Sequence, residues 1–462
     1  MAPPSYLPLH SKSPSLPTLA SPTTFTFNRL RLRIGVLLFL VLSTTLVALY
    51  SADLFPSIYA ALAFTALAPS SASLSSSRVN PRIGLIQQVA YWVSPAARPT
   101  CNLEPWHNER YASLRNSSNV FLAMNLHDNE EVLPTFFQEI PKLLDFLGPE
   151  RVFISIYENG SSDRTPRLLR HFDELLKEMG APHRIITEGT ARASDKEDGH
   201  RINFLAAVRN IAMEPLYSGS AAALLPDGGP FDDVLWINDV FHCTADVLEV
   251  LYQRRVQSAT QACALDWGVW GDQVIYDRWV LRPMSGSVLY DYNEIVDWFS
   301  SEYTREEQLA HLPQLLTDER DGPTRERIQS ALPTQVFSCW NGATAFDASV
   351  FAPPTDLRFR ASHGDLDEQG QLREVTEKAS ECFLSSVDLW KAGLGKIALV
   401  PKASLAYSLQ DYETHRKDRP LPADHDSSLE TIGWVHEPPA QVAMQDYANW
   451  WGPERWAPWD EQ

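Results

Sequence analysis

The chain has 462 residues, of which 44% are hydrophobic and 14 are tryptophan, so it can bury a sizeable core and is not wholly disordered. Its formal net charge of −19 argues against a nucleic-acid partner, because a phosphate backbone would be repelled and no basic patch is segregated. The length allows two or three average domains, or one enzyme domain of about 250 to 300 residues with tails.

The five cysteines allow disulfides if the chain enters an oxidising compartment. None of them has the spacing of a zinc site, and their odd number leaves at least one thiol unpaired within the chain. In an oxidising lumen one or two disulfides would form, and the spacing does not assign the pairs. The five are Cys101, Cys243, Cys263, Cys339 and Cys382.

The amino-terminal part predicts a membrane anchor. Residues 1–33 are rich in Pro, Ser and Thr, contain no acidic residue and end on three arginines, which is typical of a disordered cytosolic tail. Residues 34–52 carry no charge and are long enough to cross a bilayer of about 30 Å as a helix. The preceding arginines keep the amino end cytosolic, so the rest of the chain enters the lumen. A cleaved signal peptide is the alternative; the long leader favours an uncleaved anchor followed by a stem over residues 53–115.

Residues 116–410 have the pattern of an α/β domain. Apolar runs bounded by polar residues predict strands at 120–125, 152–157, 183–187, 234–238, 261–267 and 396–400. Apolar residues at helical spacing predict helices after the first two strands and at 202–216, 244–256 and 381–390. Alternation of this kind indicates a mostly parallel sheet. The Pro- and Trp-rich tail, residues 411–462, either wraps the domain or is poorly ordered.

The strand at 234–238 ends on Asn238 and Asp239. Ligands of open α/β sheets bind beyond the carboxyl ends of the strands, so Asp239 is placed to meet a metal ion or a nucleotide diphosphate. The alternative is that the two residues only open a turn or cap a helix.

The strand at 152–157 leads into Glu158, followed by glycine and small hydroxyl residues that let the backbone approach a ligand. An acid at this position can accept hydrogen bonds from a base or ribose; a structural turn is the alternative. Arg201 and Arg209 are candidates for phosphate contacts, since a guanidinium pairs with phosphate oxygens, or else are surface ion-pair residues. The sequon at Asn116 is an acceptable glycosylation site, whereas the one at Asn159 falls inside the proposed site and is expected to stay unused.

Six ordered segments between about residues 119 and 407 carry a family resemblance. They read FLAMNLHDNEEVLP, VFISIYENGSSDRT, FDDVLWINDVF, ACALDW with IYDRWV, FSCWNGATAF and SECFLSSVDLW. In this order they resemble the fungal capsule-associated α-1,3-mannosyltransferases of glycosyltransferase family 69. The resemblance implies a GT-A fold, an α/β/α sandwich with a mixed, mostly parallel sheet. It also implies a single-pass type II protein of the Golgi membrane, a GDP-mannose donor and transfer with retention at the anomeric carbon.

The resemblance also implies roles for individual residues. Asp239 falls at the metal-binding place of the DxD motif, although Ile237 and Asn238 leave that motif without its first acid. The resemblance implies donor contacts for Glu158 and Asp163, a place in the sugar or acceptor site for Trp340, Asn341 and Gly342, and a late acid at Glu381. The residues themselves add Ser161, Arg201, Arg209 and Asn238 as donor-binding candidates, Asp266 as a catalytic candidate at a strand end, and Trp340 as a flat face on which a sugar stacks.

These residues predict a mechanism with open alternatives. A divalent cation, Mn²⁺ or another, held by Asp239 would neutralise the departing diphosphate. The acceptor hydroxyl would attack either on the face of the leaving group or after Glu381 or Asp266 has acted as nucleophile. A lumenal glycan-binding or polysaccharide-export factor without catalysis is the alternative function, and a glycan hydrolase fits less well. The acceptor glycan and the oligomeric state do not follow from the sequence.

Overall fold

The computed structural model describes residues 80–187, 189, 201–268, 274–300, 304–362, 379–416, 420, 426–445 and 454–461. They lie in a unit that begins at Val79. The predicted cytosolic tail (1–33) and membrane anchor (34–52) lie outside these residues, as do residues 53–79 of the predicted stem. Within the described ranges, no helix combines the length and the apolar character needed to cross a bilayer.

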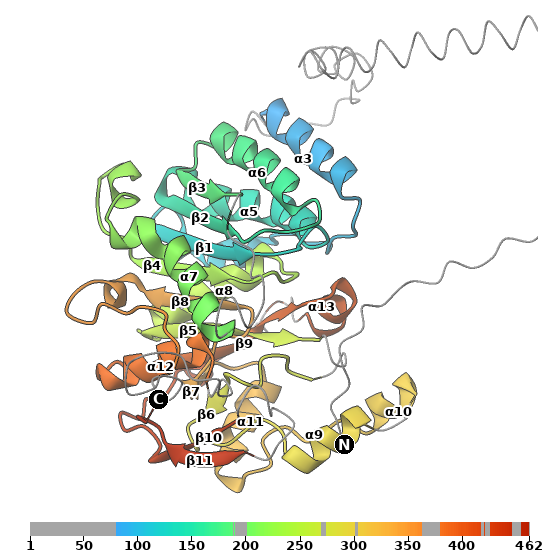
Figure 1. Cartoon of the computed structure of the whole chain (residues 1–462), viewed down its shortest axis with the longest axis vertical. Helices are drawn as coiled ribbons and strands as arrows, with labels where there is room; N and C mark the ends of the chain where they lie inside the picture. The colour runs from blue at the N-terminus through green and yellow to red at the C-terminus, as the bar shows by residue number, and fades with distance from the viewer. Residues whose placement is uncertain are drawn as a thin grey trace, which may run out of the picture. The chain divides into compact units, whose positions relative to one another are not determined.

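A mixed sheet of nine strands organises the described unit (Figure 1). Its order is β3-β2-β1-β4-β8-β5-β9-β7-β6. Strands β8 and β7 run against the other seven, so the predicted mixed, mostly parallel α/β sheet is confirmed. The strands are β1 Val120–Leu126, β2 Val152–Glu158, β3 His183–Ile186, β4 Asp233–Ile237, β5 Gln261–Trp267, β6 Arg282–Pro283, β7 Thr334–Ser338, β8 Ala343–Asp347 and β9 Ile397–Ala406.

Helices cover both faces of the sheet. The side chains of α3, α5, α6, α8 and α13 join one apolar cluster, and those of α7, α9, α11 and α12 join a second. Successive residues of a strand point to opposite faces, and accordingly Leu122 and Met124 of β1 lie in the first cluster, whereas Phe121 and Ala123 lie in the second. The helices are α3 Pro81–Val93, α4 Pro105–Arg110, α5 Leu133–Leu147, α6 Thr165–Met179, α7 Arg201–Tyr217, α8 Thr244–Val256, α9 Tyr292–Ser300, α10 Arg305–Ala310, α11 Gly322–Gln329, α12 Glu381–Lys391 and α13 Leu409–His415.

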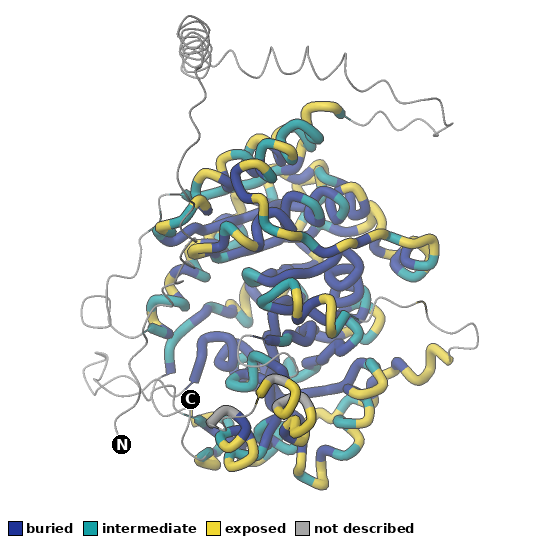
Figure 2. Tube along the Cα trace, turned by 90° about the vertical axis from the view of Figure 1, so that its right-hand side faces the viewer, coloured by how far each residue is buried: buried dark blue, intermediate teal, exposed yellow. Residues whose placement is uncertain are grey.

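The two clusters make the strands buried from both sides. In Figure 2 the interior of the described unit is largely buried, and exposed residues lie on its outside. All seven residues of β2 and all five of β4 are buried. The mainly apolar composition of these strands suits such burial, because a strand covered on both faces has no polar side.

Contacts cross both of the boundaries, 115 and 410, that the sequence predicts for the catalytic domain. Before the first boundary, Cys101 forms a disulfide with Cys243 at the start of α8. Arg110 of α4 binds Glu249 of α8 at 2.6 Å and Glu430 at 2.9 Å, and Glu430 lies in the predicted tail. Farther along that tail, β10 (Gln441–Met444) and β11 (Arg455–Pro458) form an antiparallel pair in which Val442, Ala443, Met444 and Ala457 are buried. The folded unit therefore includes residues on either side of the range 116–410.

The predicted strands and helices agree with the observed elements with two differences. The last predicted strand, at 396–400, continues through Pro401 to Ala406, with a register shift against β5 between Cys263 and Leu265. The buried stretch around Trp340 is divided between two strands, β7 and β8, that do not pair with each other. The polar segment 304–332 contains the short helices α10 and α11.

Candidate active site

The carboxyl ends of several strands meet at one edge of the sheet. Strands β1, β2, β4, β5 and β9 share one direction, so the residues that follow them emerge together. Strand β8 runs the other way between β4 and β5, so the residues that precede it reach the same edge. The topology therefore brings together four segments that the sequence places up to 183 residues apart, at Glu158, Asp239, Asp266 and Asn341.

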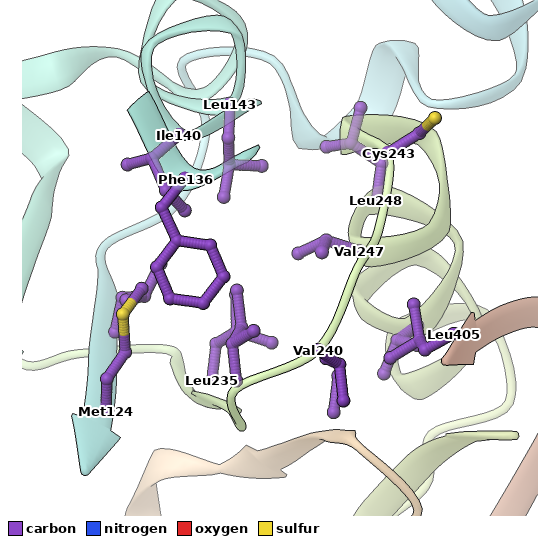
Figure 3. Packing of buried hydrophobic residues seen from close by; sticks show 14 of the residues in the cluster. Met124, Phe136, Ile140, Leu143, Leu235, Val240, Cys243, Val247, Leu248 and Leu405 are labelled. Carbon is purple, nitrogen blue, oxygen red and sulfur yellow. The ribbon is translucent and has the colours of Figure 1, made fainter. Parts of the chain in front are cut away.

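Packing and hydrogen bonds fix the loop that carries Asp239. Val240 belongs to the same apolar cluster as Leu235 of β4 and Leu405 of β9, as Figure 3 shows. The Phe241 amide donates to the Ala406 carbonyl at 2.7 Å, which ties the loop to β9. Asp239 is thereby held at the rim of the sheet and is half-buried instead of pointing into the core.

The carboxylate of Asp239 has a direct partner on the loop after β1. Asn129 Nδ2 donates to Asp239 Oδ2 at 2.9 Å, and the backbone amide of Asn129 donates to the Thr165 hydroxyl at 2.7 Å. Burial raises the pKa of Asp239, and the hydrogen bond from Asn129 and the charge of Arg209 oppose that rise. A buried carboxylate that remains short of positive charge is a suitable place for a cation.

The donor set around Asp239 fits a cation that a phosphate-containing substrate also binds. Among the described residues, the one group of three side chains close enough to hold an ion by themselves is Cys101, Glu139 and Cys243. That group is not a metal site, because the two cysteines form a disulfide. One protein carboxylate together with phosphate oxygens is a usual way to bind a hard divalent cation, so Asp239 suits such a role.

Asn238 and Trp340 pair with each other. Trp340 Nε1 donates to Asn238 Oδ1 at 3.1 Å, and Asn238 Nδ2 donates to the Tyr407 hydroxyl at 3.2 Å. Trp340 is only 1% exposed, and its ring lies against Trp236, Phe346 and Phe359. The prediction that a sugar stacks on Trp340 is therefore wrong, because protein covers this ring. Trp340 instead packs among other aromatic side chains and holds Asn238 through its indole N–H.

Asn341 and Gly342 form the tight turn that begins β8. Both have left-handed backbone conformations, with φ of 46° and 81°, and the Gly342 carbonyl accepts the Asn238 amide at 2.8 Å. Asn341 Nδ2 donates to Asp266 Oδ1 at 2.8 Å. Asp266 is fully buried, and burial raises its pKa to about 6 against the hydrogen bond from Asn341. The turn therefore joins the acids of β4 and β5 into one site.

The carboxylates of Glu158 and Asp163 accept backbone amides and thereby fix the loop after β2. Glu158 is fully buried, its Oε1 accepts the Ser161 amide, and its Oε2 has no partner among the described residues. The Ser161 hydroxyl accepts the Asp128 amide at 2.9 Å. The two carboxylate oxygens of Asp163 accept the backbone amides of Glu130 and Thr165 at 2.9 and 2.8 Å. Asp163 thus orders the start of α6, and the free oxygen of Glu158 is the better candidate for a donor contact.

Arg209 is fixed at the centre of the site. Its Nε donates to Glu381 Oε1 at 2.8 Å, and its guanidinium lies 4.4 Å from the ring centre of Trp340 and 5.0 Å from that of Trp236. Glu381, at the first position of α12, is 2% exposed. Arg201, at the first position of α7, is half-buried, and its charge lowers the pKa of Tyr276 against the stronger effect of burial. Both arginines therefore lie in the region of Asp239 and Asp266.

Three further residues belong to the site and were not predicted as site residues. They are Asn129, which binds Asp239, and the neighbours Tyr276 and Asp277, which follow the loop after β5. The Tyr276 ring lies 4.2 Å from that of Tyr407, and both phenols interact electrostatically with Asp239 and Asp266. All three lie inside segments that carry the family resemblance, but none of them directly follows a predicted strand, and the fold brings them to this edge.

Comparison with known proteins identifies the chain's relatives. Residues 119–388 match the family described as Cryptococcal mannosyltransferase 1. The chain belongs to this family. Alpha-1,3-mannosyltransferase CMT1 of Cryptococcus neoformans var. neoformans serotype D (strain JEC21 / ATCC MYA-565) is 29% identical over 398 residues, which cover 80% of each chain. The resemblance found in the sequence and the prediction of a glycosyltransferase are confirmed for this member of the Cryptococcal mannosyltransferase 1 family.

Solved structures show more distant similarity. One is the mannosyltransferase PcManGT from Pyrobaculum calidifontis in complex with GDP-Man and Mn²⁺, with a TM-score of 0.32, 9% identity, and coverage of 74% of this chain and 67% of that chain. Another is S. aureus TarS 1-349, with a TM-score of 0.32, 9% identity, and coverage of 64% and 62%.

Proposed function

We propose that the chain is a retaining glycosyltransferase of the GT-A type that moves mannose from GDP-mannose to a mannoside acceptor in α-1,3 linkage. The product would belong to cell-wall or capsule polysaccharide, or to a glycan. Family membership supports mannosyl transfer, and the printed activity of the Cryptococcus neoformans relative supports the linkage. The placement of Asp239 just after the carboxyl end of β4, where it accepts a hydrogen bond from Asn129 and feels the charge of Arg209, is the structural observation that carries the proposal.

The residues of the site have separable tasks in this reaction. Asp239 holds Mn²⁺ or another divalent cation, which when bound neutralises the diphosphate leaving group. Arg209 adds a fixed positive charge, and its ion pair with Glu381 and its contact with Trp340 keep it from moving during the reaction. Glu158 presents its unpaired oxygen to the base or ribose of the donor. Tyr276 and Tyr407 are half-buried aromatic rings beside the acids, and they replace Trp340 as candidates for contact with a sugar.

The catalytic proposal is tested with Asp239→Asn in the full chain. Turnover of GDP-mannose with a mannoside acceptor should fall by at least about 100-fold, the usual effect of removing one electrostatic contact in the transition state. Folding should survive: burial raises the pKa of Asp239, so its ionised form costs stability at neutral pH and the amide removes that cost. The unfolding temperature of the variant should therefore equal or exceed that of the wild type.

A matched control separates the loss of the Asp239 carboxylate at the site from the mere loss of one negative charge. Asp227 is an exposed aspartate with a side chain 72% accessible, and Asp227→Asn should leave turnover unchanged. GDP release by the wild type favours the enzyme over a glycan-binding factor on the same fold. Full turnover in Asp239→Asn would overturn the assignment of the central acid.

The cellular location is proposed from the sequence of the amino-terminal part and from the disulfides. An uncharged segment at 34–52 behind three arginines suits a single-pass type II protein of the Golgi membrane with its catalytic domain in the lumen. The two disulfides, Cys101–Cys243 and Cys263–Cys339, support this placement because such bonds persist in oxidising compartments. Alkylation of the protein from a membrane preparation, before and after reduction, tests whether four of the five cysteines are oxidised.

A further inference from the structure

Asp277 is a half-buried acid that directly contacts the strand-end acid Asp266. The backbone amide of Asp277 donates to Asp266 Oδ1 at 3.2 Å, and Asp277 Oδ1 accepts the amide of Val280 at 3.2 Å. The Leu281 amide donates to the Asp277 carbonyl at 3.3 Å and closes the turn. The side chain is therefore held in a fixed turn at the site and does not move freely in solvent.

The charges that face Asp277 come from four elements. Asp266 of β5 and Glu381 of α12 are negative, and Arg209 of α7 and Arg282 of β6 are positive. Neither cation forms an ion pair with Asp277: Arg209 binds Glu381 through Nε at 2.8 Å, and Arg282 donates to the backbone carbonyls of Ala443, Arg278 and Leu281 at 2.7 to 2.9 Å. Within the described part of the chain, Asp266 and Asp277 have no ion-pair partner at all. Two neighbouring carboxyl groups in such surroundings cannot both ionise easily.

The hydrogen bonds indicate which of the two keeps the proton. Asp266 Oδ1 accepts two N–H groups, from the Asn341 side chain at 2.8 Å and from the Asp277 backbone, and such bonds favour a carboxylate. The side chain of Asp277 accepts one, from Val280. Burial and the charge of Asp266 raise the pKa of Asp277 to about 8, and burial raises that of Asp266 to about 6, which agrees with this order.

We propose that Asp277 carries a proton in the active enzyme and is a positioning residue that holds Asp266 as a carboxylate, ready to bind a hydroxyl of the sugar substrate. The buried Oδ2 of Asp266, which has no partner among the described residues, is the atom that binds this hydroxyl. The inference deepens the proposed glycosyl transfer and rests on it. It adds Asp277, an acid that acts in its protonated form, whereas the acids of the proposed function act as carboxylates.

The activity test compares an amide with an apolar side chain at this position in the full chain. Asp277→Asn keeps the size and neutral state of a protonated acid, so its turnover should stay within about tenfold of the wild type. Asp277→Leu should lose about 100-fold, the effect of a misplaced reacting group. If the leucine variant does not fold, Asp277→Ser takes its place. Equal loss in the asparagine and leucine variants, with both folded, would overturn the proposal.

The pH profile supplies the readout that a merely structural role would not change. Wild-type turnover should decline as the pH rises through about 8, because Asp277 then loses its proton. Asp277→Asn should lack this decline. Asp321→Asn is the matched control: Asp321 is also buried with a raised pKa, but it binds Ser285 and Ser287 away from the site, so this variant should keep the wild-type profile. A decline that persists in Asp277→Asn would contradict the assignment.

A second measurement does not depend on the enzymatic activity. A carboxyl group whose pKa is raised in the folded state stabilises the fold at low pH and loses that contribution as the pH rises toward the folded value. The unfolding temperature of Asp277→Asn, relative to the wild type, should therefore increase between pH 5 and pH 8. A constant difference would refute a neutral Asp277 even if the donor sugar had been chosen wrongly. An increasing difference without any turnover of GDP-mannose would instead count against the proposed function alone.

Discussion

Replacing Arg110 by methionine should destabilise the protein strongly, although the residue lies outside the predicted catalytic domain. Arg110 binds both oxygens of Glu249 at 2.7 and 2.6 Å and one oxygen of Glu430 at 2.9 Å. Its side chain is 9% accessible, and those of Glu249 and Glu430 are 2% and 10% accessible. The variant leaves two buried carboxylates near each other without their shared guanidinium; Tyr111 still donates to Glu249, and Gln253 still donates to both.

The expected cost follows from this geometry. Removing one partner of a buried ion pair costs about 3 to 5 kcal/mol, because the remaining charge is desolvated and unpaired. An exposed pair costs about 0 to 1 kcal/mol, and Arg82, which is 75% accessible in its pair with Glu178, provides the matched control Arg82→Met. Adding Glu249→Gln to Arg110→Met should recover part of the loss, since it removes one of the two stranded charges.

Denaturant-induced unfolding of the full chain measures these differences. The midpoint of Arg110→Met should fall well below that of Arg82→Met, and the double variant should lie between Arg110→Met and the wild type. A free energy of unfolding for Arg110→Met within about 1 kcal/mol of the wild-type value would refute this reasoning. It would mean that the bonds from Arg110 do not hold the region before residue 116 and the tail after residue 410 to α8.

Two further predictions concern the loops of the site. Gly342→Ala should destabilise the fold by about 1 to 2 kcal/mol through its left-handed backbone, and should also lower turnover, because its Cβ would lie 3.2 Å from Leu405 and 3.3 Å from Asp266. Gly393 has a similar φ of 75° with no atom within 4 Å of the added carbon, so Gly393→Ala should show the backbone cost while keeping turnover; equal turnover in both variants would contradict the crowding argument. Replacing Cys101 and Cys243 together by serine opens a loop of 142 residues and should cost about 5 kcal/mol in the unfolding free energy. An unchanged denaturant midpoint would show that the bond is dispensable.

The strands that pack on both faces could be predicted from the sequence because their signal is local. Val152–Glu158 is mainly apolar, with Ser155 and Glu158 as the exceptions, and burial on both sides favours such a composition. The order of the strands could not be predicted in the same way. Strand β8 inserts between β4 and β5 and runs against both, and nothing in its five residues specifies these partners. The partners are set by packing between segments that are distant along the chain.

The acids at strand ends could likewise be predicted, since a strand end marks a place in the fold. Asp239 and Glu158 are examples, and both lie at the expected edge. Asp277 follows no predicted strand, and the bridge between Trp267 and Ile275 brings it to Asp266. Trp340 was misjudged because an aromatic residue near a turn can face either ligand or core; its indole N–H, which donates to Asn238, is what turns it inward.

The second disulfide joins β5 to the residue just before Trp340. Cys263 lies three residues before Asp266, and Cys339 lies two residues before Asn341, so the covalent bond sits directly behind the contact between that acid and that amide. Recombinant production in a reducing bacterial cytoplasm would leave Cys263 and Cys339 as free thiols, without this covalent link. A preparation made there can contain well-expressed protein in which Asp266 and Asn341 are poorly placed. Low activity of such protein could be mistaken for a wrong choice of substrate, and titration of the free thiols in each batch would reveal the defect.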